Sequence, residues 1–227
     1  MQTNGLVKSI LKVLGVVIAL SAFVGTSNVV VNANATDHTL EMEGFKFVGE
    51  FTAEDVAYFQ ENLHLLRAQL PAWHQYLLEA RPIAFNFDAA LGERGRAAEA
   101  RCCEADGTGV ITFGHHFGQL AASPEAEDQT PEARRIAFLG LLAHELTHIR
   151  DQRAGRFTAK TDRKSCIAAE SSGLSKQVEI KRDLAKIQLT GEPASAAIYR
   201  SQLDRQISVE TNDLRSRAFW DFYCGGY

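Results

Sequence analysis

The sequence has little of several features that mark particular classes of protein. It contains no run of basic residues and no alternation of basic with aromatic residues, and its formal net charge is only −4. These absences argue against a nucleic-acid-binding protein. It also lacks internal repeats, low-complexity tracts and long linkers, which favours one compact domain. Because 45% of the residues are hydrophobic and 23% are charged, the composition is that of an ordinary globular protein with one core.

The apolar run near the N-terminus, residues 13–25, is too short to cross a bilayer comfortably. It follows two lysines and precedes an A-x-A pattern of small residues. This order is typical of a secretory signal peptide. We therefore predict a signal peptide over residues 1–35, a mature domain over residues 36–227 without stable membrane insertion, and a secreted or periplasmic location. An uncleaved membrane anchor is the alternative.

Cysteine is scarce, and the four that occur are Cys102, Cys103, Cys166 and Cys224. They lack the C-x-x-C spacing of structural zinc sites, which argues against zinc bound by cysteines. An even number of cysteines in an exported protein predicts disulfides. A bridge between adjacent residues is geometrically strained, so we expect Cys102 and Cys103 each to pair with Cys166 or Cys224. The sequence does not decide between the two pairings.

The secondary-structure pattern predicts an α+β fold that is mostly helical, with a small sheet flanking one side of a central helix. The stretch 89–106 is expected to be a polar loop or short helix. Extended segments are expected at 39–51, 82–88 and 107–114, and helices at 53–69, 70–80, 131–154, 167–189 and 194–222. The helix that begins at Pro131 is the clearest, because proline suits the first helical position and Gly155 is a natural stop.

That helix carries the clearest chemical motif, H-E-x-x-H, spelled HELTH at residues 144–148. Two histidines four positions apart share one face of a helix, at the separation that suits a tetrahedral zinc ion. His144 and His148 are therefore candidate zinc ligands. Glu145 lies one residue further round, too far to join the same ligand set but able to face a water on the metal. The alternative interpretation is two surface histidines on an amphipathic helix.

A third ligand has to come from elsewhere, because no histidine follows His148 and the extended pattern H-E-x-x-H-x-x-G-x-x-H is absent. A carboxylate on a later helix is then expected. Glu170 and Glu179 compete for this role, and Asp162 on the intervening loop is a weaker candidate.

Helical geometry favours Glu170 over Glu179. On a wheel of residues 167–189, Glu170 falls within the apolar arc, whereas Glu179 falls on the opposite, polar side. A carboxylate on a buried face is costly unless a metal or a cation satisfies it. Lys181 projects near the same stripe and is the alternative partner for Glu170.

From about residue 131 to 185, the chain resembles the H-E-x-x-H zinc metallopeptidases of the gluzincin kind, which include the thermolysin-like enzymes. The resemblance rests on HELTH and on the spacing from His148 to Glu170, and it does not cover the whole chain. The chain also departs from the family pattern. Such families often place an acid four residues after the ligand glutamate, where this chain has a leucine after Glu170 and an aspartate after Glu179. Glu179 therefore stays open as a ligand.

The resemblance implies a catalytic Zn²⁺ with an open position, and Glu145 as the general base that accepts a proton from water and passes it to the leaving amine. Resembling enzymes often stabilise the oxyanion with a downstream tyrosine or histidine. Since no histidine follows the motif, Tyr199 and Tyr223 are the candidates, although either could be a core tyrosine.

Such enzymes also commonly lay a peptide along an edge strand near the active-site helix. The segment 107–114 precedes that helix and is the expected edge. His115 and His116 follow it directly. They are expected to line the cleft, to assist proton transfer or, as ordinary loop residues, to have no role.

The leading hypothesis is a secreted zinc peptidase whose partner is a peptide or protein substrate. A zinc hydrolase acting on an amide in a cell-wall or small-molecule substrate is an alternative, because the motif predicts water activation and not the substrate. A non-catalytic binding protein with the same fold is a third possibility, although such a protein is expected to have lost Glu145 or a ligand.

Overall fold

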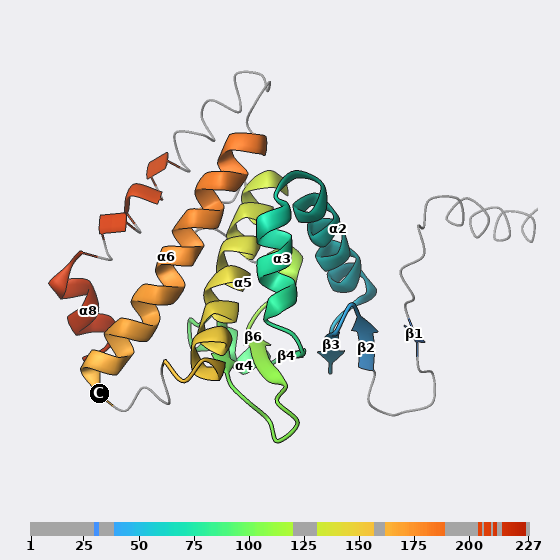
Figure 1. Ribbon diagram of the computed structural model, residues 1–227, viewed down its shortest axis with the longest axis horizontal. Coiled ribbons are helices and arrows are strands. Elements are labelled where there is room, and N and C mark those ends of the chain that lie inside the picture. Colours follow the sequence, from blue (N-terminus) through green and yellow to red (C-terminus); the bar gives the residue numbers. More distant parts are fainter. Residues whose placement is uncertain are drawn as a thin grey trace, which may run out of the picture.

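The computed structural model describes residues 30–31, 39–119, 131–156 and 162–188, and near the C-terminus residues 204–205, 207–209, 211–212 and 215–225. These residues form the predicted α+β fold, with helices packed beside a small mixed sheet (Figure 1). Apart from residues 30–31, the predicted signal peptide lies outside the described residues. Of the helices that the structure describes, none has both the length and the apolar character needed to span a membrane.

The sheet has the strand order β1-β2-β3-β4-β6-β5. The central strands β3, β4 and β6 are parallel, whereas β2 and β5 run antiparallel to their neighbours. The strands are β1 (Val30–Val31), β2 (Thr39–Met42), β3 (Phe45–Val48), β4 (Ile83–Phe87), β5 (Ala98–Arg101) and β6 (Gly109–Phe113). The prediction that 107–114 forms the edge was wrong, because β6 lies between β4 and β5. The edge strands of the described sheet are β1 and β5, and β5 is the one that contacts α5.

The helices are α2 (Ala53–Gln69), α3 (Pro71–Glu79), α4 (Ala89–Glu93), α5 (Pro131–Arg153), α6 (Arg163–Gln188) and α8 (Arg217–Tyr223), with a 3₁₀ turn, η1 (Phe117–Gln119). The predicted single helix over 194–222 was wrong. Arg215 lies in a turn, and Ser216 has extended backbone and starts α8 by accepting a hydrogen bond from the Phe219 amide. A serine that caps a helix in this way begins a new helix and ends any earlier one.

The core forms where one face of the sheet meets the helices. Alternate residues of the central strands are fully buried on that face, as the two-residue period of a strand requires. Phe59 of α2, Phe117 of η1 and Phe138 of α5 pack against the buried rings of the strands, with ring centroids 5.2 Å apart for Phe59 and Phe85 and 4.9 Å apart for Phe113 and Phe117. The large hydrophobic residues of these strands with no more than 1% of their surface exposed are Phe45, Phe47, Ile83, Phe85, Ile111 and Phe113.

Helix α5 occupies the centre of the molecule, between α6 and α3 (Figure 1). It approaches β6 closely because Gly109 has no side chain: a Cβ there would lie 2.6 Å from Cγ2 of Ile149. Its C-terminal end is held by Arg153, whose guanidinium donates hydrogen bonds to the carbonyls of Ala80, Pro82 and Gly107. These contacts fix α5 between the sheet and the turn that follows α3.

Two disulfides link the cysteines as Cys102–Cys103 and Cys166–Cys224. The expectation that Cys102 and Cys103 each reach to one of the distant cysteines was therefore wrong. The reason is tertiary: Cys166, in the first turn of α6, lies against the end of α8, where Cys224 is buried. Cys102 follows the edge strand β5, and its amide donates a hydrogen bond to the side chain of Gln152 on α5.

Candidate metal centre

Two imidazoles from α5 meet inside the protein. His144 and His148 are one helical turn apart, and both are buried, with 6% and 4% of their surfaces exposed. Their Nε2 atoms lie 3.0 Å apart. The interpretation of these residues as surface histidines is therefore excluded. Two nitrogens that face each other at this distance converge on a common point, as ligands of one ion do.

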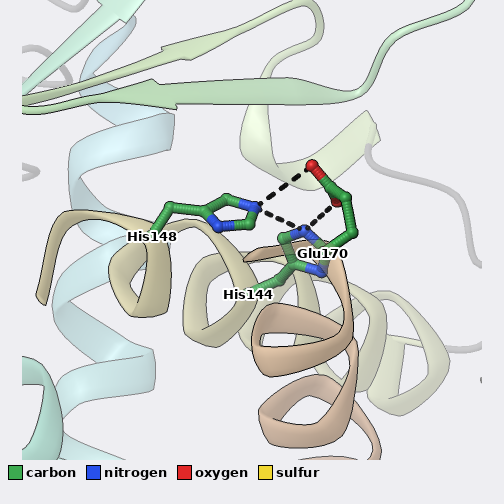
Figure 2. Close-up of side chains that lie close together, drawn as sticks. All are labelled: His144, His148 and Glu170. Atoms are coloured by element: carbon green, nitrogen blue, oxygen red, sulfur yellow. Dashed lines mark hydrogen bonds and ion pairs between the residues drawn. The ribbon is translucent and has the colours of Figure 1, made fainter. Parts of the chain in front are cut away.

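Helix α6 brings Glu170 to the same point (Figure 2). Oε2 of Glu170 lies 3.2 Å from Nε2 of His144, and Oε1 lies 3.6 Å from Nε2 of His148. Glu170 is itself only 2% exposed. Each of the three residues can offer one ligand atom, with all the atoms within 4.8 Å of one another. The buried group of His144, His148 and Glu170 could therefore hold a metal ion.

The spacing of these donor atoms fits a small tetrahedral ion. Nitrogen and oxygen ligands bind zinc at about 2.0–2.2 Å, which places two ligands of a tetrahedron roughly 3.3–3.5 Å apart. The two Nε2 atoms lie 3.0 Å apart, and Oε2 of Glu170 lies 3.2 Å from Nε2 of His144, both slightly below that range. The 3.6 Å contact to Nε2 of His148 comes from the other oxygen of the same carboxylate. Three protein ligands also leave a fourth position open, as in catalytic rather than structural zinc sites.

The electrostatics keep Glu170 in the form that binds a cation. Burial alone raises the pKa of its carboxyl group, but hydrogen bonds and charge from His144 and His148 outweigh burial and hold the pKa well below its ordinary range. A carboxylate that remains charged in a buried position is a strong ligand for a metal ion, since a cation offsets the cost of its desolvation.

Glu179, the competing ligand candidate, lies away from the site. It is exposed, and its Oε2 forms an ion pair with Nζ of Lys176 at 2.5 Å. Asp162 precedes α6, where its carboxylate accepts a hydrogen bond from the Ser165 amide. Lys181, the alternative partner of Glu170, is buried, and its aliphatic chain packs against Gly140.

Glu145 is 5% exposed, buried beside the two ligands on α5. It is not a member of the group that could hold an ion. Its role as the general base stays a prediction. Tyr199 lies outside the described residues, and Tyr223 lies in α8 with a side chain that the structure does not describe. Both therefore stay predictions.

The two histidines that follow β6 differ in their surroundings. His115 is exposed, whereas Nδ1 of His116 lies 2.7 Å from Oδ2 of the buried Asp55. Asp55 also completes the capping box at the start of α2 with Thr52. The ring of His116 stacks on Phe87. These contacts tie the loop to α2 and are structural.

One residue that shapes the site was not predicted from the sequence. Gly173 faces the ring of His144 across the helix interface, and a Cβ at this position would lie 2.9 Å from both Cδ2 and Nε2. The absence of a side chain lets α6 approach closely enough for Glu170, less than a turn away, to reach the imidazoles. A glycine on the apolar arc of a helix was the available signal. Glycine is unfavourable inside a helix, so its presence there indicates that close packing requires it.

We expect Gly173→Ala to weaken the binding of a metal ion by about 10- to 100-fold, the range seen when the surroundings of a metal ligand are disturbed. The new methyl group displaces the His144 ring, although alanine itself favours the helix by about 0.5–1 kcal/mol. Competition with a chromophoric chelator measures the affinity. Gly118→Ala is the control, because no atom lies within 4 Å of the position that its Cβ would take. Unchanged affinity in Gly173→Ala would show that the close contact is not needed.

Comparison with known proteins gives no relative. No family model matches the chain, and neither a curated protein nor a solved structure matches it significantly. The functional inference therefore has to come from the chemistry of the site.

Proposed function

We propose that this protein is a zinc-dependent peptidase. The observation that carries the proposal is the convergence of His144, His148 and Glu170 on one buried point, with Glu145 next to the first histidine on the same helix. Metal ligands alone would suit many functions. A buried carboxylate directly after the first ligand is the addition that water activation requires.

Zinc is the proposed metal because of the donor set and its geometry. Two imidazoles and a carboxylate also bind Fe(II) in oxygenases, so the ligands alone do not choose the metal. The glutamate inside the motif favours zinc, since hydrolysis needs a base beside the ion whereas oxygen activation at iron does not. Metal analysis of the purified protein distinguishes the two.

The roles of the residues follow from their positions. A zinc ion held by the three ligands would polarise a substrate carbonyl and lower the pKa of a water molecule. The carboxylate of Glu145 accepts the proton of the attacking water and passes it to the nitrogen of the leaving amine. Both imidazoles are buried, so bulk water is kept away from them. Electrostatic interactions in the site are stronger as a result.

The edge of the sheet supports a peptide as the substrate. Strand β5 packs against α5, and its outer edge has no strand partner among the described residues. The Cys102 amide, directly after β5, bonds to Gln152 four residues after His148 at 2.8 Å. A peptide that added to β5 through main-chain hydrogen bonds would therefore run beside the α5 segment that carries the metal ligands.

The proposal is tested by metal analysis together with cleavage of a peptide library. We expect about one zinc per chain, and cleavage that a chelator removes and added zinc restores. A set of small-molecule and cell-wall amides is assayed in parallel. Hydrolysis of those amides with no peptide cleavage would replace the peptidase by a different zinc hydrolase, and absence of stoichiometric metal would refute the site.

A further inference from the structure

A second buried carboxylate lies beside the metal centre and has no part in the proposed chemistry. Asp151 belongs to α5, three residues after His148, and is only 3% exposed. Burial of an ionised carboxylate is costly unless hydrogen bonds or ion pairs compensate. The partners of Asp151 therefore indicate what the residue does.

The two carboxylate oxygens of Asp151 have different partners. Oδ1 of Asp151 forms an ion pair with Nη1 of Arg156 at 3.0 Å. Oδ2 accepts a hydrogen bond from Oγ of Ser172 at 2.6 Å. The side chain of Arg156 is 69% exposed, so water and salt screen that pair. The contact with Ser172 is short and partly buried, and it crosses from α5 to α6.

The position of this contact connects it to the ligands. Ser172 follows Glu170 by two residues, and Asp151 follows His148 by three, so both ends of the bond lie within one turn of a ligand. A slide of one residue between the helices moves a side chain by about 1.5 Å along the axis. Metal–ligand distances tolerate only about 0.2 Å, so a slide of that size would withdraw Glu170 from the ion.

We propose that Asp151 and Ser172 form an interhelical clamp that fixes the register of α6 on α5 and so positions Glu170 opposite the two imidazoles. Both are positioning residues and neither touches the substrate. The inference rests on the proposed function for the identity of the metal. The clamp holds α5 and α6 in the correct register before the metal binds. Metal binding then has less of the protein to order.

Ser172→Ala removes the hydroxyl and tests the clamp directly. We expect zinc affinity, measured by competition with a chromophoric chelator, to fall by about 10- to 100-fold, whereas saturating zinc should restore most of the hydrolysis. Ser172→Thr keeps the hydroxyl and should recover the affinity. Ser175→Ala is the matched control, because Ser175 is exposed on the same helix and, among the described residues, its hydroxyl donates a hydrogen bond to the Ser171 carbonyl of that helix. That variant should bind zinc as the natural protein does.

Two outcomes would overturn the clamp. One is a Ser172→Ala protein that binds zinc as tightly as Ser175→Ala does. The other is an equal rate of amide hydrogen exchange around Glu170 in the metal-free Ser172→Ala and Ser175→Ala proteins. The clamp predicts that this exchange is faster in Ser172→Ala. If zinc binds but no hydrolysis is found, the proposed function fails, and the zinc affinities of the variants still test the clamp. If zinc does not bind at all, the proposed function also fails, and the amide hydrogen exchange rates of the variants still test the clamp.

Discussion

Glu145→Gln should slow peptide hydrolysis sharply and leave the bound zinc in place. Glutamine has nearly the shape of glutamate, so the buried position stays filled, but its amide cannot accept a proton from the attacking water. General-base catalysis contributes about 10²- to 10⁴-fold to a rate, and we expect kcat to fall by that factor. Zinc content and kcat are measured on the same preparation, with substrate above its KM.

A second carboxylate of α5 serves as the control for this experiment. Glu132 lies in the first turn of the helix, more than three turns before the motif, and Glu132→Gln should keep its activity. Unimpaired hydrolysis by Glu145→Gln would refute the general-base role. Loss of zinc from that variant would contradict the ligand set, because it would place Glu145 on the metal.

The local signals in the sequence predicted the helices that begin and end with distinct residues. Helix α2 has the predicted range 53–69 because Thr52 and Asp55 form the capping box and Pro71 starts the next helix. The same holds for α5, which begins at Pro131 and ends just before Gly155, a residue with a φ of 67°. Such caps act over a few residues and can be recognised without knowledge of the fold.

Elements determined by tertiary contacts were missed. Strand β5 has the sequence AEAR, which contains none of the β-branched or aromatic residues that favour strands. Its conformation comes from antiparallel pairing with β6. The disulfide pairing was equally hidden, because it depends on where α8 lies against the start of α6.

The candidate site likewise contains residues that local sequence predicts and residues that depend on tertiary contacts. The spacing of His144 and His148 is a property of one helix, so the sequence contains it completely. Glu170 required an argument about which face of a separate helix is buried, and the buried Glu170 and exposed Glu179 agree with that argument. Gly173 and the clamp escaped prediction, because each exists only when α5 and α6 are in contact.

The choice between the two glutamates leads to the second large effect. Glu170→Gln should lower zinc affinity by at least about 100-fold, since removal of a ligand costs more than the 10- to 100-fold seen for disturbed surroundings. Glutamine fills the same volume but lacks the negative charge that offsets that of the ion. Hydrolysis should fall with the loss of metal. Zinc affinity is measured by chelator competition, and activity is followed as zinc is added.

Glu179→Gln is a matched control within the same helix, because it makes the same chemical change at an exposed residue nine positions later. It removes only the surface ion pair with Lys176, which is worth about 0–1 kcal/mol, so zinc affinity and hydrolysis should be unchanged. The opposite result, zinc lost from Glu179→Gln and kept by Glu170→Gln, would transfer the ligand role to Glu179. Because Glu179 is exposed and paired with Lys176, that outcome would require α6 to rotate by about half a turn and to slide by about 13.5 Å along its axis. The rotation would bring the polar face of α6 into the core. The two variants therefore test the ligand set and the packing of α6 together.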